Sequence, residues 1–146
     1  MENIRPTIFV RMKLDDGAKA PTKAHEDDAG FDMYSRTDEV VKAHSSCVFD
    51  TGVHIQIPSG YVGFLKSKSG MNCKYSIVNE GVIDAGYTGP IIIKLYNNSD
   101  DDYIVRKGDK ISQLVFLSIP NFSLFTTDEL YTTERGEGRM GSTGMR

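Results

Sequence analysis

The segment "GVIDAGYTGP", residues 81–90, places a carboxylate and an aromatic ring among glycines. Asp84 follows the apolar pair Val82 and Ile83, and Tyr87 comes three residues later, just before an apolar run. Glycines allow a tight turn and let the backbone come close to a ligand. The segment therefore predicts the tight end of a hairpin, and its carboxylate and ring are more than a hairpin that serves only the fold requires.

Two other stretches are rich in groups that bind phosphate. One is "KSKSGM", residues 66–71, and the other is the glycine-rich tail "ERGEGRMGSTGMR", residues 134–146. Ammonium, guanidinium, hydroxyl and backbone N–H groups all donate hydrogen bonds to phosphate oxygens. Each stretch also has an ordinary explanation, because surface lysines are common and glycine-rich termini usually lack a fixed structure. No Walker pattern G-x-x-x-x-G-K-[ST] occurs in the chain. The donors of the tail are Arg135, Arg139, Ser142 and Thr143.

Two polar side chains interrupt apolar runs. Asp32 lies between Phe31 and Met33 in "AGFDMYS", and Gln113 falls within "GDKISQLVF". A buried amide needs hydrogen-bond partners, and a partly buried aspartate is usually paired or serves a site. Both residues are therefore candidates for a site as well as for bonds between strands.

The elements that must position these groups are short strands. Apolar residues alternate with mostly polar ones in residues 7–14 and 53–57, and further short runs rich in β-branched and aromatic residues follow. Turn sequences such as "LDDG", "PSGY" and "RKGDK" separate them. This pattern predicts an all-β sandwich, jelly roll or small barrel. The best helix candidate is about one turn near "SGMNCKY", in which Ser69 would be the cap.

Length and charge limit the class of protein. A chain of 146 residues predicts a single domain, which we expect to span residues 1–133 and to be followed by a mobile arm, residues 134–146. The net charge of -3 gives no general attraction to nucleic acid or to an anionic membrane, so neither is an expected partner. We find neither a signal-peptide pattern nor a long apolar run, and we expect a soluble protein of the cytoplasm or of a host cell's interior.

The cysteines and histidines favour neither a disulfide framework nor a zinc site. Cys47 and Cys73 are too few for such a framework, and the three histidines have no zinc-ligand spacing. A hard metal ion that arrives on a phosphate ligand stays open.

Taken in order, the five unusual stretches resemble the five sequence motifs of the trimeric dUTPases. They read "AGFDMYS", "SKSGM", "GVIDAGYTG", "GDKISQLV" and "RGEGRMGSTG", and they extend from Ala29 to Gly144. The resemblance implies a distorted jelly-roll or β-barrel fold with a mobile C-terminal arm. It also implies a homotrimer whose active sites are shared between chains.

The resemblance further implies a reaction and its residues. Members of the family cleave dUTP to dUMP and pyrophosphate by attack of water on the α-phosphorus, with Mg²⁺ on the triphosphate. This limits uracil incorporation into DNA and supplies dUMP for dTMP synthesis. By similarity Asp84 would be the general base, Gln113 would bind a phosphate oxygen near the attacked bond, and Tyr87 would lie against the deoxyribose.

Other motif residues would bind the base, the metal waters and the phosphates. The backbone of Gly81, Val82 and Ile83 would contact uracil, and Asp32 would hold water ligands of Mg²⁺. The residues implied for phosphate contacts and for closure of the arm are Ser69, Gly70, Arg135, Gly141, Ser142 and Thr143.

Two motifs depart from the family's usual sequence. Lys68 stands where the family usually has an arginine that pairs with the aspartate of the fourth motif, here Asp109. Lysine keeps the charge but not the bidentate geometry. Met140 stands where a phenylalanine stacks over uracil, and Arg139 beside it adds a candidate phosphate contact. We expect activity to survive both changes.

Two alternatives stay open. One is a dCTP deaminase or a bifunctional deaminase and pyrophosphatase, which shares the fold and needs a glutamate near the pyrimidine; Glu80 is the nearest candidate. The other is a regulatory protein in which dUTP acts as a ligand that orders the arm. Asp84 argues against a pure binder, because recognition alone does not need a base.

Overall fold

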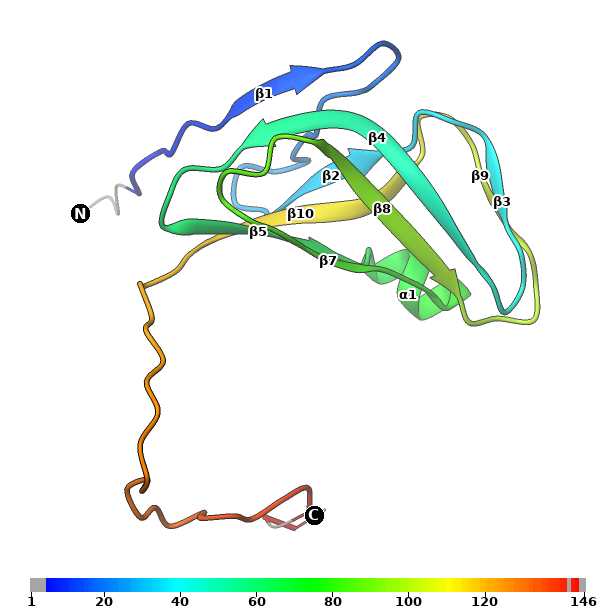
Figure 1. The fold of residues 1–146 in the computed structure, drawn as a ribbon. Coiled ribbons are helices and arrows are strands. Elements are labelled where there is room, and N and C mark those ends of the chain that lie inside the picture. Colours follow the sequence, from blue (N-terminus) through cyan, green and yellow to red (C-terminus); the bar gives the residue numbers. More distant parts are fainter. Residues whose placement is uncertain (1–4, 142, 145–146) are drawn as a thin grey trace.

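The computed structural model describes residues 5–141 and 143–144, in which two antiparallel four-stranded sheets face each other (Figure 1). The first sheet has the order β1 (Arg11–Leu14), β4 (Ser46–Gln56), β8 (Pro90–Asn97), β6 (Ile77–Val78). The second has the order β2 (Gly30–Tyr34), β10 (Lys110–Ser118), β5 (Tyr61–Lys66), β7 (Glu80–Ile83). A separate pair consists of β3 (Glu39–Val41) and β9 (Tyr103–Val105). The predicted all-β, jelly-roll-like class is confirmed.

The core lies between the two sheets. In β8, Ile91, Ile93 and Leu95 are buried while the residues between them are exposed. From the second sheet, Leu65 and Leu114 join the same cluster. This alternation follows from the strand geometry, in which successive side chains point to opposite faces. The two-residue period in the sequence therefore marks the face that each strand buries.

Strand β4 contains a bulge that sets the direction of its second half. Its pairing with β8 shifts register between Asp50 and His54, and Gly52 within the bulge has a φ of 68°. This left-handed backbone conformation favours glycine. Beyond the bulge, His54 pairs with Pro90 at the start of β8.

The helix α1 (Ser69–Tyr75) forms where the sequence predicts one, but its start differs from the prediction. Lys68 is the N-cap residue and its side chain makes no capping bond. Ser69 is already helical, so its predicted role as the cap is wrong. The helix ends at Ser76, whose left-handed backbone lets its N–H bond the Asn72 carbonyl oxygen at 3.1 Å.

The segment from Gly81 to Gly89 is not the end of a hairpin, which corrects a second prediction. Strand β7 pairs with β5 in the second sheet, whereas β8 pairs with β4 and β6 in the first. The segment therefore crosses from one sheet to the other. Glycines identify a turn, but they do not tell which strands pair on either side of it.

After β10, residues 119–141 form neither helix nor strand and are almost entirely exposed. Figure 1 shows this segment running away from the two sheets. Its exposed apolar side chains are Ile119, Phe122, Leu124, Phe125, Leu130, Tyr131 and Met140.

Within the part of the chain that the structure describes, no helix has the length and apolar character that a membrane span requires.

Replacing Ile93, which is 0% exposed, tests the position of the core. We expect Ile93→Ala to lower the free energy of unfolding by about 2–5 kcal/mol, because it removes buried methyl groups and leaves a cavity. Lys94→Ala, on the exposed face of the same strand, should change it by less than about 0.5 kcal/mol. Urea denaturation followed by circular dichroism measures both values, and equal losses would contradict the alternation of β8.

Candidate active site

The turn that follows β7 presents Asp84 to solvent. The N–H of Tyr87 donates to the Asp84 carbonyl oxygen at 3.2 Å, and Gly86 inside the turn has a φ of 90°. Val82 is exposed, Ile83 is buried and Asp84 is exposed again, as strand alternation dictates. The partly dry surroundings expected for Asp84 are therefore absent in the described chain. Its carboxylate is open to a water molecule or a ligand.

Tyr87 folds back over its own turn. Its hydroxyl donates to the Pro90 carbonyl oxygen at 2.9 Å. A Cβ atom at Gly89 would lie 2.5 Å from the Tyr87 hydroxyl oxygen, so only glycine leaves room for the ring there. The side chain is still 45% exposed. The ring is thus anchored at its hydroxyl and offers exposed surface to a ligand.

Strand β7 is at the edge of its sheet, and it carries Gly81, Val82 and Ile83. Each of these residues pairs with β5 on one side only. Among the described strands none lies on the other side of β7, so alternate backbone N–H and C=O groups point outward. Such groups suit a planar polar ligand that hydrogen-bonds along its edge.

A second cluster forms where β2, β10 and β5 lie side by side. In the register of these strands Gln113 pairs with Asp32 on one side and with Lys66 on the other. The Gln113 amide donates to the Ser67 carbonyl oxygen at 3.1 Å. The first, second and fourth motifs therefore meet at one end of this sheet.

Asp32 lies beneath two ammonium groups in this cluster. Lys68 bonds its Oδ1, and Lys110 lies 3.2 Å from its Oδ2. Burial alone would raise the pKa of Asp32, but the hydrogen bonds from both lysines outweigh it and hold the pKa below its ordinary value. The same contact with Asp32 raises the pKa of Lys110.

The expected pairing of Lys68 with Asp109 does not occur. Asp109 instead accepts a hydrogen bond from the Arg106 N–H at 2.9 Å and closes the turn before β10. Its backbone carbonyl accepts the Ser35 N–H at 2.9 Å, which joins the fourth motif to the first. Lys68, extending from the end of β5, reaches Asp32 instead.

A buried asparagine supports the second cluster, and the sequence interpretation missed it. Asn79 is 2% exposed, and its amide donates to the Ser112 hydroxyl at 2.7 Å. Its backbone N–H donates to the Ser67 hydroxyl at 2.9 Å. These bonds fix the chain just before Lys68. The signal was available, because Asn79 interrupts an apolar run as Gln113 does.

The turn with Asp84 and the cluster with Gln113 lie at opposite ends of β7. Ile83, next to Asp84, pairs with Gly63, whereas Glu80 at the other end pairs with Lys66. A strand advances about 3.3 Å per residue, so roughly 10 Å separates these ends. One chain therefore divides the candidate residues into two groups.

The remaining candidates lie apart from both groups. Ser69 and Gly70 are exposed in the first turn of α1. In the tail, Arg135 donates to the Gly138 carbonyl oxygen at 3.1 Å, and Ser142 is outside the described residues. Figure 1 shows this end of the chain away from the sheets. The other tail candidates, all exposed, are Arg139, Met140, Gly141 and Thr143.

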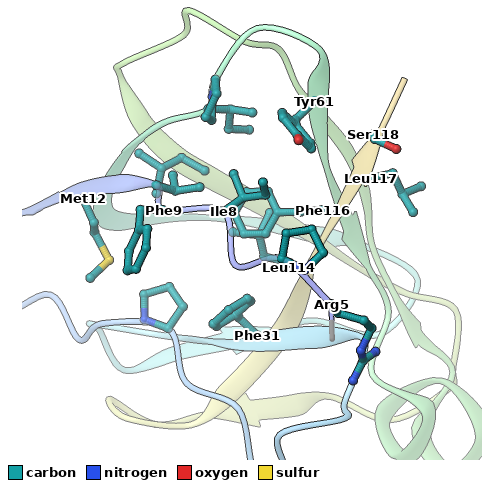
Figure 2. Close-up of a pocket in the computed structure, with 16 residues that line it drawn as sticks. Arg5, Ile8, Phe9, Met12, Phe31, Tyr61, Leu114, Phe116, Leu117 and Ser118 are labelled. Atoms are coloured by element: carbon teal, nitrogen blue, oxygen red, sulfur yellow. The ribbon is translucent and has the colours of Figure 1, made fainter. Parts of the chain in front are cut away.

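The largest groove is apolar and lies elsewhere. Its volume is about 690 Å³, and Figure 2 shows Ile8, Phe9, Phe31 and Phe116 gathered around it. Asp84 and Gln113 are not among the described residues that line it. The groove is therefore separate from both groups of candidates.

The donor set does not form a metal site by itself. In residues 5–141 and 143–144, no three His, Cys, Asp or Glu side chains gather in an arrangement that could hold a metal ion. Asp32 is already neutralised by two lysines, which makes it a poor direct ligand. A magnesium ion fits this site only when phosphate oxygens bring it.

The ion pairs of Asp32 predict a pH dependence of stability. A carboxylate whose pKa is lowered in the folded state stabilises it above the unfolded-state value, near 3.8, and loses this effect as the pH falls through the folded-state value. We expect Asp32→Asn to lower the free energy of unfolding at pH 7 by about 1–3 kcal/mol and by progressively less below about pH 4. Urea denaturation at several pH values measures the difference, and a difference independent of pH would contradict the pairing.

Comparison with known proteins agrees with this geometry. The dUTPase family model matches residues 16–144. The deoxyuridine 5'-triphosphate nucleotidohydrolase of Paramecium bursaria Chlorella virus 1 is 40% identical over 134 residues, 91% of this chain and 95% of that protein.

Solved structures give the same result. A mutant dUTPase of Staphylococcus bacteriophage 80alpha with dUpNHpp has a TM-score of 0.88 and 32% identity, over 94% of this chain and 99% of that chain. A mutant dUTPase from phage phi11 of S. aureus, described as revealing the coordination of a structural Mg(II) ion, has a TM-score of 0.79 and 29% identity, over 86% of this chain and 100% of that chain. The family match includes all five motifs, and we conclude that this chain belongs to the dUTPase family.

Proposed function

We propose that the protein hydrolyses dUTP to dUMP and pyrophosphate, which limits uracil incorporation into DNA and supplies dUMP for dTMP synthesis. The observation that carries this proposal is the turn after β7, which offers the exposed Asp84 carboxylate beside the anchored ring of Tyr87. A base and a sugar platform on one turn suit attack on a bound nucleotide. Family membership gives this turn its substrate.

In this proposal the third motif binds the nucleoside and activates water. The outward backbone groups of Gly81, Val82 and Ile83 bond the edge of uracil, and the ring of Tyr87 packs against the deoxyribose. A ribose 2′-hydroxyl would then meet the ring. Asp84 orients the attacking water and takes its proton, a role that typically contributes about 10²–10⁴-fold.

The second cluster and the arm bind the triphosphate. Gln113 holds an oxygen near the α-phosphorus, while Lys68, Ser69 and Gly70 bond the phosphates. Mg²⁺ arrives on the substrate and neutralises phosphate charge, with Asp32 placed toward its water ligands. The tail residues then close over the terminal phosphates and exclude bulk water. These tail residues are Arg135, Arg139, Met140, Gly141, Ser142 and Thr143.

We further propose a homotrimer with shared active sites. The separation of Asp84 and Gln113 to opposite ends of β7 supports this, because one chain does not bring both groups to one phosphorus. A neighbouring chain would supply the missing group. The nucleotide substrate also supports a location in the cell interior, either the cytoplasm or a host cell.

A pyrophosphate-release assay with dUTP, dTTP, dCTP and UTP, with and without Mg²⁺, tests the proposal. We expect release from dUTP alone, and only with the metal. Equal release from all four nucleotides would contradict the assigned pocket. Ammonia released from dCTP would favour a deaminase, although Glu80 is 72% exposed and pairs with Lys66 at 3.1 Å, away from any pocket described above.

Replacing Asp84 tests its role as the base. We expect Asp84→Asn to retain dUpNHpp binding and to lower kcat by on the order of 10²-fold or more, because the water loses its proton acceptor. Glu80→Gln is the matched control and should keep kcat within about twofold, since Glu80 only pairs with Lys66. Turnover of dUTP by Asp84→Asn at the parent rate would show that the role is wrongly assigned, and it would favour the alternative of a regulatory nucleotide binder.

Removing residues 135–146 tests the arm. We expect the shortened protein to keep its midpoint of thermal unfolding within about 2 °C, because the described part of this segment adds nothing to the core. Its turnover should fall by roughly 10²-fold, because the phosphates are no longer positioned. Circular dichroism and the pyrophosphate assay give the two values. A protein that fails to fold, or one that keeps full activity, contradicts the proposed arm.

A further inference from the structure

His54 joins two loops that are distant in the sequence. Its Nδ1 lies 2.7 Å from the Thr88 carbonyl oxygen, and its Nε2 lies 2.9 Å from Oδ2 of Asp15. Its side chain is 20% exposed, so both contacts are partly shielded from water. The bulge in β4 places His54 next to Pro90 and thus beside the turn of the third motif.

Both partners of this imidazole are acceptors. A neutral imidazole has one N–H and can donate to only one of them, whereas an imidazolium donates to both. In accordance with this, the Thr88 carbonyl and then the Asp15 carboxylate raise the pKa of His54 above 6.5, while burial and Lys13 act in the opposite direction. The raised pKa means that the doubly bonded form is complete below about 6.5 and is lost as the pH rises through the folded-state value.

The charged groups around His54 come from three elements. Strand β1 contributes Lys13, which pairs with His54 in register, and Arg11 two residues away. The loop after β1 contributes Asp15, whose pKa is lowered first by its bond to His54. Arg36 lies against the same loop and donates to the Asp16 carbonyl oxygen at 3.3 Å. The neighbours from the third motif and β8 are uncharged.

The Thr88 contact acts on the nucleoside turn. Thr88 directly follows Tyr87, whose hydroxyl is held by Pro90 two residues beyond Thr88. A bond to the intervening carbonyl therefore fixes the chain between the ring and its anchor. When that bond is lost, the ring keeps its anchor but its backbone gains freedom.

We propose that His54 is a positioning residue for the nucleoside pocket: as an imidazolium it ties the Thr88 carbonyl to Asp15 and holds Tyr87 in place, and nucleotide binding weakens when it loses its proton. This inference rests on the proposed function. It adds to that function a pH-dependent affinity carried by a residue outside the five motifs.

The KM for dUTP as a function of pH tests the proposal. From about pH 5.5 to about pH 9 we expect KM to rise by roughly three- to tenfold, with kcat changing by less than about twofold relative to the control. The control is His44→Gln, since His44 bonds Asp100 at 2.7 Å on another loop. In His54→Gln this rise in KM should disappear. Using the ratio to the control removes the titration of the substrate and of Asp84, and a rise that persists in His54→Gln overturns the proposal.

Asp15→Asn provides a second variant that leaves His54 in place. Loss of the carboxylate charge lowers the pKa of His54, so the rise in KM should move to lower pH without vanishing. A rise at unchanged pH would contradict the role of Asp15. Because the Thr88 contact survives in this variant at low pH, its KM there should match that of the parent.

A measurement without turnover separates this proposal from the proposed function. NMR titration of the nucleotide-free protein should show the pKa of His54 above 6.5, and the Gly89 amide, which shares a peptide bond with the Thr88 carbonyl, should follow the same titration. An unshifted His54 or a silent Gly89 amide overturns the inference even if dUTP is hydrolysed. A shifted pair in a protein without dUTPase activity would refute the proposed function and leave the His54 contact established.

Discussion

Strand β10 hydrogen-bonds β2 on one side and β5 on the other, and its register sets Gln113 between Asp32 and Lys66. Three stretches that are distant in the sequence meet through this one pairing. A shift by one residue would turn the side chain of Gln113 to the opposite face. The buried Leu114 prevents such a shift, because it would have to leave the core. Core packing therefore fixes the geometry of the polar cluster.

The polar cluster also shows how lysines replace a planar fork. One guanidinium can bond both oxygens of a carboxylate, whereas an ammonium is a point charge. Around Asp32 two lysines from different strands share that task, with Lys68 on one oxygen and Lys110 on the other. The orientation of the carboxylate then depends on the alignment of two strand ends instead of one side chain.

The sequence was sufficient for the fold class and for the five motifs, because alternation in segments such as β8 and polar residues inside apolar runs are local signals. It was not sufficient for pairing. Glycines around Asp84 predicted a hairpin, but the chain crosses between sheets there, and only the register of β7 and β8 with other strands decides this. The exposure of Asp84 was predictable from the alternation after Val82, but the apolar neighbours drew the opposite interpretation. The bonds of His54 to Thr88 and Asp15 depend on the bulge in β4, which no short pattern announces.

The separation of Asp84 from Gln113 along β7 has a genetic consequence in the proposed trimer. A chain that has lost Asp84 still carries an intact phosphate cluster, and a chain that has lost Gln113 still carries an intact nucleoside turn. When two such defective alleles are expressed together, mixed trimers contain some sites in which each chain supplies what the other lacks. The two alleles would complement each other, although neither encodes a working enzyme alone.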